Sequence, residues 1–135
     1  MADTVFQFEL VSPEKLILSK PAAMVTVPGG EGEYGVLPGH APMITTVKAG
    51  VIEVFAEENA AAIDRIFVAG GFAEVTQTRC TVLADEAIPV ATLNRVKLEE
   101  EAKSLNEKIA AASEADREAL LALRDILTAK LQAAA

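Results

Sequence analysis

One glycine-rich segment has a spacing that could bind a nucleotide. It reads Gly30-Glu31-Gly32-Glu33-Tyr34-Gly35, which matches the G-x-G-x-x-G pattern of dinucleotide-binding loops and follows a predicted strand. Such a loop must open a helix whose N-terminus faces the phosphates. Residues 36–42 contain two prolines and a glycine, which exclude a continuous helix, and Glu31 and Glu33 would repel an anionic ligand. The segment is therefore interpreted as a turn-rich surface loop. The alternative is a small nucleotide-dependent enzyme, which calorimetry with ATP and NAD tests.

The other residues with reactive side chains are isolated. His40 is the single histidine and Cys80 the single cysteine, so neither a histidine-based metal site nor a nucleophile–base pair finds its partners at a workable spacing. Cys80 lies in an alternating strand segment, where a free cysteine behaves as a small core hydrophobe. The acidic run 99–101 is typical of a solvated helix face. These residues predict a non-catalytic protein that needs no metal and no cofactor.

Composition limits the partners and the compartment. The net charge is −8 and lysines and arginines form no cluster, which argues against binding to nucleic acid or to an anionic lipid surface. One cysteine and an N-terminus interrupted by Asp3 and Glu9 indicate a reducing compartment without a signal peptide. Every apolar run is shorter than the roughly 18 residues that a spanning helix needs. Association with a membrane is therefore expected to go through another protein.

The elements that must position these residues change in kind near Pro89. All eight glycines, all six prolines and all six aromatic residues lie at or before Pro89. Short alternating runs separated by turn signals predict strands at 5–11, 16–18, 24–27, 43–47, 51–55, 63–68, 72–76 and 79–83. This spacing, without a helical pattern between the runs, favours an antiparallel β-sandwich over βαβ units. We expect a β-sandwich of about ten short antiparallel strands as an N-terminal domain spanning residues 1–88.

Residues 89–135 carry a helical period and are expected to form a second domain, a C-terminal antiparallel α-helical hairpin. Asn94 is a predicted N-cap for the first helix, and Ser113 with Asp116 resembles a capping box that opens the second. Each helix has one apolar stripe. The stripe residues are Leu98, Ala102, Leu105, Ile109 and Ala112 in the first helix and Leu120, Leu123, Leu127 and Leu131 in the second.

Three segments resemble those of the epsilon subunits of F-type ATP synthases. They are Gly32-Glu33-Tyr34-Gly35-Val36-Leu37-Pro38-Gly39-His40-Ala41-Pro42, Val68-Ala69-Gly70-Gly71-Phe72-Ala73-Glu74-Val75 and Val82-Leu83-Ala84-Asp85. The resemblance implies a ten-stranded sandwich with a helical hairpin and a non-catalytic rotor subunit of the central stalk. Its implied partners are the gamma subunit and the c ring, and its role is to couple proton flow to ATP synthesis. Its implied location is peripheral, on the cytoplasmic face of the bacterial plasma (inner) membrane.

The resemblance also assigns roles to single residues of the glycine-rich segment. It implies that the c ring meets Glu31, Gly32, Glu33, Tyr34, Gly35 and His40. The loop that carries them is shaped by Pro38, Gly39 and Pro42. An acidic projection of this kind suits a partner surface with basic or hydrogen-bonding groups.

The hairpin departs from relatives that bind ATP. Their first helix opens with a pattern like [IL]-D-x-x-R-A, where this chain has Asn94 in place of the acid and Lys97 in place of the arginine. The exchange removes a carboxylate and a bidentate fork, and so argues against nucleotide binding at Asn94 and Lys97. The resemblance implies transient contact of the hairpin with the alpha and beta subunits. Because the second helix carries more acids than bases, we expect only weak inhibition.

The helical stripes alone leave another hypothesis open. A free-standing adaptor could pair its hairpin with a partner's coiled coil. This hypothesis predicts that residues 90–135 hold the affinity for the partner, whereas the rotor hypothesis assigns most of it to residues 1–88.

Overall fold

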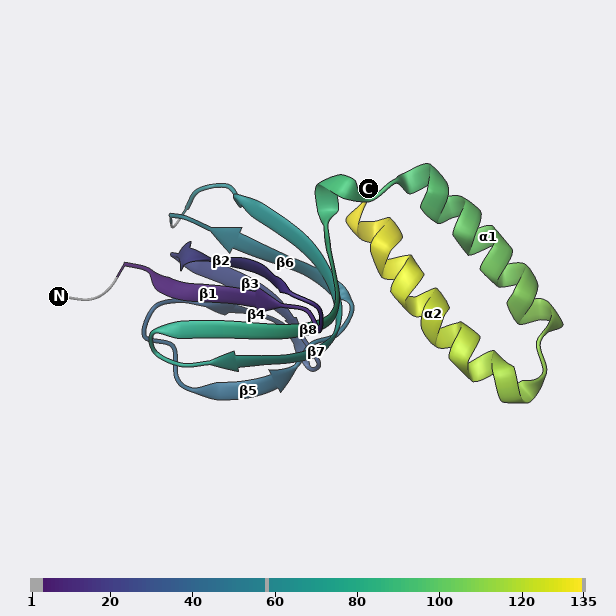
Figure 1. Ribbon diagram of the computed structural model, residues 1–135, viewed down its shortest axis with the longest axis horizontal. Coiled ribbons are helices and arrows are strands. Elements are labelled where there is room, and N and C mark those ends of the chain that lie inside the picture. The colour runs from purple at the N-terminus through teal and green to yellow at the C-terminus, as the bar shows by residue number, and fades with distance from the viewer. Residues whose placement is uncertain (1–3, 58, 135) are drawn as a thin grey trace. The chain divides into compact units, whose positions relative to one another are not determined.

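The computed structural model describes residues 4–57 and 59–134. Residues 1–3 and 135, at the outer ends of the two predicted domains, lie outside it. The chain divides into two compact units between Pro89 and Val90, one residue beyond the predicted boundary. The first unit consists of strands and the second of helices (Figure 1).

The first unit is a β-sandwich, which confirms the predicted fold class. Its eight strands are β1 (Phe6–Val11), β2 (Leu16–Ala22), β3 (Met24–Gly29), β4 (Gly32–Val36), β5 (Met43–Thr46), β6 (Gly50–Phe55), β7 (Asp64–Val75) and β8 (Arg79–Pro89). They hydrogen-bond in the order β2-β1-β8-β7-β6-β3-β4, and β5 joins the other edge of β7. All pairs are antiparallel except β1 with β8, which is parallel.

Eight strands are described where about ten were predicted, and one long strand, β7, replaces two of the predicted runs. The runs 63–68 and 72–76 are not separate strands, because β7 continues through Gly70 and Gly71, whose φ angles of 76° and 109° bend it without ending it. Its first half pairs with β6 and its second half with β5. β8 likewise runs on to Pro89 beside β7. Both strands therefore pass from one layer of the sandwich to the other.

Strand β4 corrects the expectation of a turn-rich loop at Gly32 to Pro42. Residues 32–36 pair in register with β3, from Val25 opposite Val36 to Gly29 opposite Gly32. Two glycines and a glutamate disguise this strand, because they are poor strand formers that the β3 partner nonetheless accommodates. The irregular loop is thus limited to residues 37–42.

The core lies between the two layers and follows the alternation in the sequence. Phe6, Phe8 and Leu10 of β1 are buried while their neighbours are partly exposed. Cys80 has no exposed surface, as predicted, and burial raises the pKa of its thiol to about 12. The cluster is completed by Ala22, Val25, Val27, Val36, Val47, Ile52, Val54, Ile66, Val68, Ala73, Val75, Val82 and Ala84.

The second unit is the predicted antiparallel helical hairpin. A short 3₁₀ turn (η1, Val90–Thr92) leads into α1 (Arg95–Ala111), and α2 (Glu114–Ala133) returns beside it (Figure 1). Asn94 caps α1 as predicted, because its Oδ1 accepts a hydrogen bond of 3.1 Å from the backbone N–H of Lys97. The predicted capping box at Ser113 is wrong. The Ser113 hydroxyl bonds Asp116 Oδ2 at 3.2 Å and no backbone N–H of α2.

The apolar stripe of α2 is narrower than predicted. Leu127 is buried and Leu120 and Leu131 are half-buried, whereas Leu123 is 54% exposed. At 3.6 residues per turn, Leu127 and Leu131 lie within about 20° of the line through Leu120, and Leu123 lies about 60° away. Because α2 packs against one helix, α1, only the line of Leu120, Leu127 and Leu131 is covered. Leu123 therefore points to solvent.

Candidate functional site

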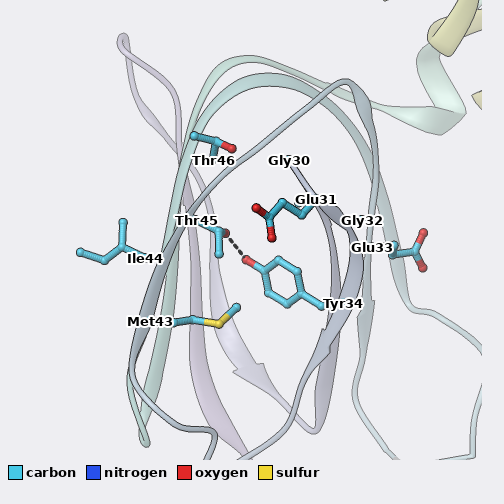
Figure 2. Close-up of a pocket in the computed structure, with 10 residues that line it drawn as sticks. Gly30, Glu31, Gly32, Glu33, Tyr34, Met43, Ile44, Thr45 and Thr46 are labelled. Atoms are coloured by element: carbon cyan, nitrogen blue, oxygen red, sulfur yellow. Dashed lines mark hydrogen bonds between the residues drawn. The ribbon is translucent and has the colours of Figure 1, made fainter.

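A groove of about 580 Å³ lies between β4 and β5, where the two layers of the sandwich end (Figure 2). Among the described strands, β4 pairs only with β3 and β5 only with β7, so each of the two has a free edge. The groove is lined by Gly29, Gly30, Glu31, Gly32, Glu33, Tyr34, Met43, Ile44, Thr45 and Thr46.

A side-chain hydrogen bond spans the groove. The Tyr34 hydroxyl and Thr45 Oγ1 lie 2.6 Å apart (Figure 2). Both residues face the interior, because their cross-strand partners Val27 and Ala73 are buried. Desolvation by burial is the main cause that raises the pKa of Tyr34, and the bond from Thr45 partly opposes it. The backbone also connects the two sides, because the Gly30 N–H donates to the Thr46 carbonyl at 3.1 Å.

Two glycines make room for the side chains that form the floor of the groove. A Cβ on Gly29 would lie 2.7 Å from Cε1 of Tyr34, and one on Gly30 would collide with Oγ1 of Thr46. Gly32 has a φ of 137°, which allows the chain to reverse from β3 into β4. The G-x-G-x-x-G spacing therefore serves a tight turn and close packing of an aromatic ring.

The two acids of the turn have different directions. Figure 2 shows the Glu31 carboxylate over the groove, on the side of Tyr34 and Thr45, and the Glu33 carboxylate pointing away from it. None of the described residues that line the groove is a lysine or an arginine. Within residues 4–57 and 59–134, neither acid forms an ion pair. The groove therefore offers an uncompensated carboxylate.

The other predicted c-ring residues lie outside this groove. Gly35 is an exposed residue of β4, and His40 belongs to the loop 37–42. His40 Nδ1 bonds the Ala41 carbonyl at 2.7 Å, and its backbone N–H donates to the Leu37 carbonyl at 3.1 Å.

The loop that carries His40 is tied to a neighbouring turn. The N–H of Gly39 donates to the carbonyl of Gln77 at 2.9 Å, and the φ of Gly39 is 82°. Pro38 and Pro42 stand on either side of this anchor. The contact fixes the loop at the end of β7.

The four residues of β5 that line the groove were missed by the sequence prediction. Met43, Ile44, Thr45 and Thr46 come from β5, which follows the glycine-rich segment only after the loop 37–42. Their alternation predicts a strand but not its position opposite β4, because that position depends on pairing with β7.

The residues of the degenerate nucleotide motif already form hydrogen bonds within the hairpin. Asn94 uses its side-chain oxygen in the cap of α1, and Lys97 supplies the backbone N–H of that bond. Arg95 Nε bonds Glu99 at 3.0 Å, and its Nη1 reaches the Leu131 carbonyl at 3.3 Å.

The described part of the chain holds no group of three or more metal-ligating side chains. None of its helices is both long enough and apolar enough to span a membrane.

A row of apolar side chains crosses the outer face of the layer that contains β2, β1, β8 and β7. Phe72 of β7 lies opposite Leu83 of β8, Leu83 opposite Val11 of β1, and Val11 opposite Leu16 of β2. The exposed fractions of Phe72, Leu83 and Leu16 are 55%, 47% and 55%. We call these four residues the outer apolar row. A hollow of about 140 Å³ lies along it, lined by Val11, Ser12, Pro13, Gly71, Phe72, Leu83, Ala84 and Asp85.

Comparisons with known proteins agree on one family. Residues 5–90 match the family "ATP synthase, Delta/Epsilon chain, beta-sandwich domain". An ATP synthase epsilon chain of Rhodospirillum centenum is 55% identical over 124 residues, which cover 89% of this chain and 84% of the relative. One of Rhodospirillum rubrum is 51% identical over 136 residues, covering 92% of this chain and 98% of the relative.

Solved structures have the same fold. A chain of the Euglena gracilis mitochondrial ATP synthase (OSCP/F1/c-ring) matches with a TM-score of 0.86 and 27% identity, covering 99% of this chain and 83% of that one. A chain of the Tetrahymena thermophila mitochondrial ATP synthase (central stalk/c-ring) has a TM-score of 0.64 and 11% identity over the full length of both chains. The second likeness, at this identity, concerns the fold alone.

Proposed function

The chain belongs to the ATP synthase epsilon chain family, and we propose that it docks on the gamma subunit through the outer apolar row and on the c ring through the turn and loop 31–42. It is a non-catalytic subunit of the central stalk of an F-type ATP synthase, and it takes part in ATP synthesis coupled to proton transport. The proposal assigns two separate surfaces of the sandwich to two partners.

The observation that carries the gamma proposal is the outer apolar row. Phe72, Leu83 and Leu16 expose about half of their surfaces. Phe72 and Leu83 lie on adjacent strands, and Val11 of β1 connects Leu83 to Leu16 of β2. Such contiguous apolar patches typically mark protein interfaces. The hollow beside the row can take one apolar side chain of the partner, which is how interface anchors are usually buried. Because the row lies on regular strands, it needs no rearrangement to bind.

The c-ring contact follows from the family and from the shape of the turn. Glu31, Gly32, Glu33 and Tyr34 gather at one end of the sandwich, and Gly35 and His40 follow in β4 and the loop. Contact with the c ring holds the subunit at the membrane without insertion of its own chain. We propose that this location is the cytoplasmic face of the bacterial plasma membrane, which protease access to inverted and right-side-out vesicles tests.

We assign only weak inhibition to the hairpin, through transient contact with the alpha and beta subunits. Its second helix carries Arg117, Arg124 and Lys130 against Glu114, Asp116, Glu118 and Asp125, so it is not attracted to acidic surfaces. ATP hydrolysis by the synthase measured with and without α2 tests this. A large rise on removal of α2 would contradict it.

The gamma proposal is tested by placing a charge in the outer apolar row. Leu83→Asp should weaken binding of the purified chain to the gamma subunit by about a hundredfold, because an unpaired carboxylate would be buried at the interface. Leu123→Asp is the matched control, since it changes the same residue type at a similar exposure, 54% against 47%, in the hairpin. Calorimetric titration measures both affinities.

The same pair of variants separates the rotor hypothesis from the adaptor hypothesis. Thermal unfolding by circular dichroism first verifies that both variants fold. Loss of gamma binding in Leu123→Asp with normal binding in Leu83→Asp would move the affinity to the hairpin and contradict the proposal.

A further inference from the structure

We propose that Arg95 is a clasp that holds the last turn of α2 to the first turn of α1, and so sets how readily the hairpin opens. Its guanidinium makes two bonds at once. Nε donates to Glu99 Oε1 at 3.0 Å within α1, and Nη1 donates to the Leu131 carbonyl of α2 at 3.3 Å. The clasp acts within the free chain and needs no partner subunit.

The clasp lies at the open end of the hairpin. α1 begins at Arg95 and α2 ends at Ala133, and these two ends lie side by side, away from the connection through residues 112 and 113 (Figure 1). After Leu131 the chain has only Gln132 and three alanines, whose side chains can bury little apolar area. Helix ends with few buried apolar contacts open first. A polar contact here therefore acts on the part of α2 that separates most readily.

The charge of Arg95 is unfavourable for its own helix. Arg95 is the first residue of α1, and the first turn also contains Lys97 and no acid. The N-terminal end of a helix is the positive end of its dipole, where acids are stabilising and cations are not. A departure from local preference of this kind indicates that another contact compensates for it.

The same charge is favourable for α2. The last four carbonyls of a helix have no N–H partner within it, and this end of the dipole is negative. Leu131 is one of the last four residues of α2. A cation from α1 therefore caps the C-terminal end of α2 with a charge-assisted bond. Because the helices are antiparallel, this bond exists only while the hairpin is closed.

Glu99 fixes the direction of the guanidinium. It stands one turn after Arg95, at the i,i+4 spacing that brings two side chains together on one helix face. An exposed pair of this kind adds little to the stability of α1 by itself. With Nε held by Glu99, however, Nη1 is directed to Leu131. A lysine lacks the planar fork that makes both bonds in a fixed geometry.

The consequence for the synthase rests on the proposed transient contact of the hairpin with the alpha and beta subunits. α2 must leave α1 before it can extend to another subunit, and the clasp opposes the first step of that separation. A hairpin that is clasped shut spends less time in the open form. The clasp thus contributes to the weak inhibition that we assign to α2.

Amide hydrogen exchange of the whole chain, measured by NMR at low ionic strength, tests the clasp. Arg95→Gln should speed exchange of the amides of residues 128–134 by about threefold to fivefold, because one exposed, charge-assisted bond is lost. Arg95→Glu should speed it by about tenfold, since a carboxylate would then face the negative end of α2. Arg95→Lys and Glu99→Gln should each have a smaller effect, of about twofold. Salt at about 1 M should reduce all these differences.

Lys97→Gln is the matched control. It removes the same charge from the same turn of α1, and among the described residues Lys97 forms no ion pair with α2. Exchange at residues 128–134 should therefore stay within about 1.5-fold of that in the unaltered chain. Unchanged protection of the sandwich amides verifies that each variant is folded.

Equal exchange at the end of α2 in Arg95→Gln and Lys97→Gln would overturn the clasp, because Arg95 would then act only as a charge in the first turn. ATP hydrolysis by the assembled synthase separates this failure from that of the proposed function. Arg95→Gln should lower hydrolysis by less than about twofold relative to Lys97→Gln, since the open form is more populated. Faster exchange in Arg95→Gln with unchanged hydrolysis would support the clasp and contradict the contact with the alpha and beta subunits.

Discussion

The sandwich and the hairpin bury their apolar residues to very different degrees. In the sandwich, side chains from both layers meet in one cluster. Its largest members, such as Phe8 and Leu10, have no exposed surface. Among the described residues of the hairpin, only Leu98, Leu127 and Ala133 are buried, and the other stripe residues stay half-exposed. Because apolar burial is the main favourable term in folding, the sandwich should supply most of the stability of the chain.

This difference matches the division of labour that we propose. A surface that docks on two partners must keep its shape, and a strand framework with a dry core provides that. A two-helix unit with a narrow seam has a small energetic reserve and can rearrange at low cost. We propose that the two units unfold independently.

The largest effect is expected from a core truncation. Phe8→Ala should destabilise the sandwich by about 3–5 kcal/mol, because it removes a fully buried ring and leaves a cavity. Leu105→Ala, at a half-buried position of α1, should cost the hairpin about 1 kcal/mol. Amide hydrogen exchange measured by NMR reports the stability of each unit separately.

If the two units unfold independently, each of these two variants should destabilise only the unit that carries it. Phe8→Ala should leave the protection of the α1 and α2 amides unchanged, and Leu105→Ala should leave the sandwich amides unchanged. Equal losses in both units for either variant would show one cooperative structure and break the comparison.

The next effect depends on pH and concerns the sandwich alone. The folded state holds the pKa of Cys80 at about 12 against an ordinary value of 9.0, so the unfolded chain loses this proton first as the pH rises. The stability due to the neutral buried thiol is fully present below pH 9. It should fall by about 1.4 kcal/mol per pH unit between pH 9 and pH 12.

Urea unfolding of the natural chain and of Cys80→Ala over this pH range measures the effect. The variant creates a small cavity at every pH, so the comparison uses the slopes and not the absolute stabilities. Tyr34, whose pKa is raised chiefly by desolvation and to a smaller extent by Cys80, titrates in both proteins, so only the Cys80-dependent part of its contribution differs between them. Parallel slopes would contradict the assignment, and the hairpin amides should show no Cys80-dependent change.

The smallest effect lies in the hairpin and compares its two helix starts. Asn94→Ala should destabilise the hairpin by about 1 kcal/mol, because it removes the side-chain acceptor for the Lys97 N–H. Ser113→Ala should cost less than about 0.5 kcal/mol, since the Ser113 hydroxyl caps no backbone N–H. Helix amide exchange and far-ultraviolet circular dichroism measure both. A larger cost for Ser113→Ala would show that a cap forms there in solution.

Most of the fold can be predicted from the sequence, because the apolar residues repeat with the period of a strand or of a helix. The alternation of Phe6, Phe8 and Leu10 identifies β1, and the composition change near Pro89 separates strands from helices. The prediction fails where tertiary pairing overrides local preference. Gly70 and Gly71 read as a turn because glycine usually ends a strand, yet β8 holds β7 together through them.

The site is less predictable than the fold. Glu31 and Tyr34 lie three residues apart in a recognisable motif, so the sequence identifies one side of the groove. The other side requires Thr45 to lie opposite Tyr34, and the outer apolar row requires the registers of four strands. Register depends on which faces are buried and on turn geometry, and neither can be read from a single strand. Resemblance to a family supplied the partner, but not the direction in which each side chain points.

The continuous passage of β7 and β8 through both layers has a mechanical consequence. In a sandwich whose layers are joined only by loops, a force that slides one layer over the other is opposed mainly by side-chain packing. Here Gly70 and Gly71 carry the covalent backbone of β7 from the layer of β5 to the layer of β6, with β8 hydrogen-bonded alongside. Torque that enters at one surface and leaves at another therefore loads peptide bonds and a ladder of hydrogen bonds in shear. Such a body turns with little internal twist.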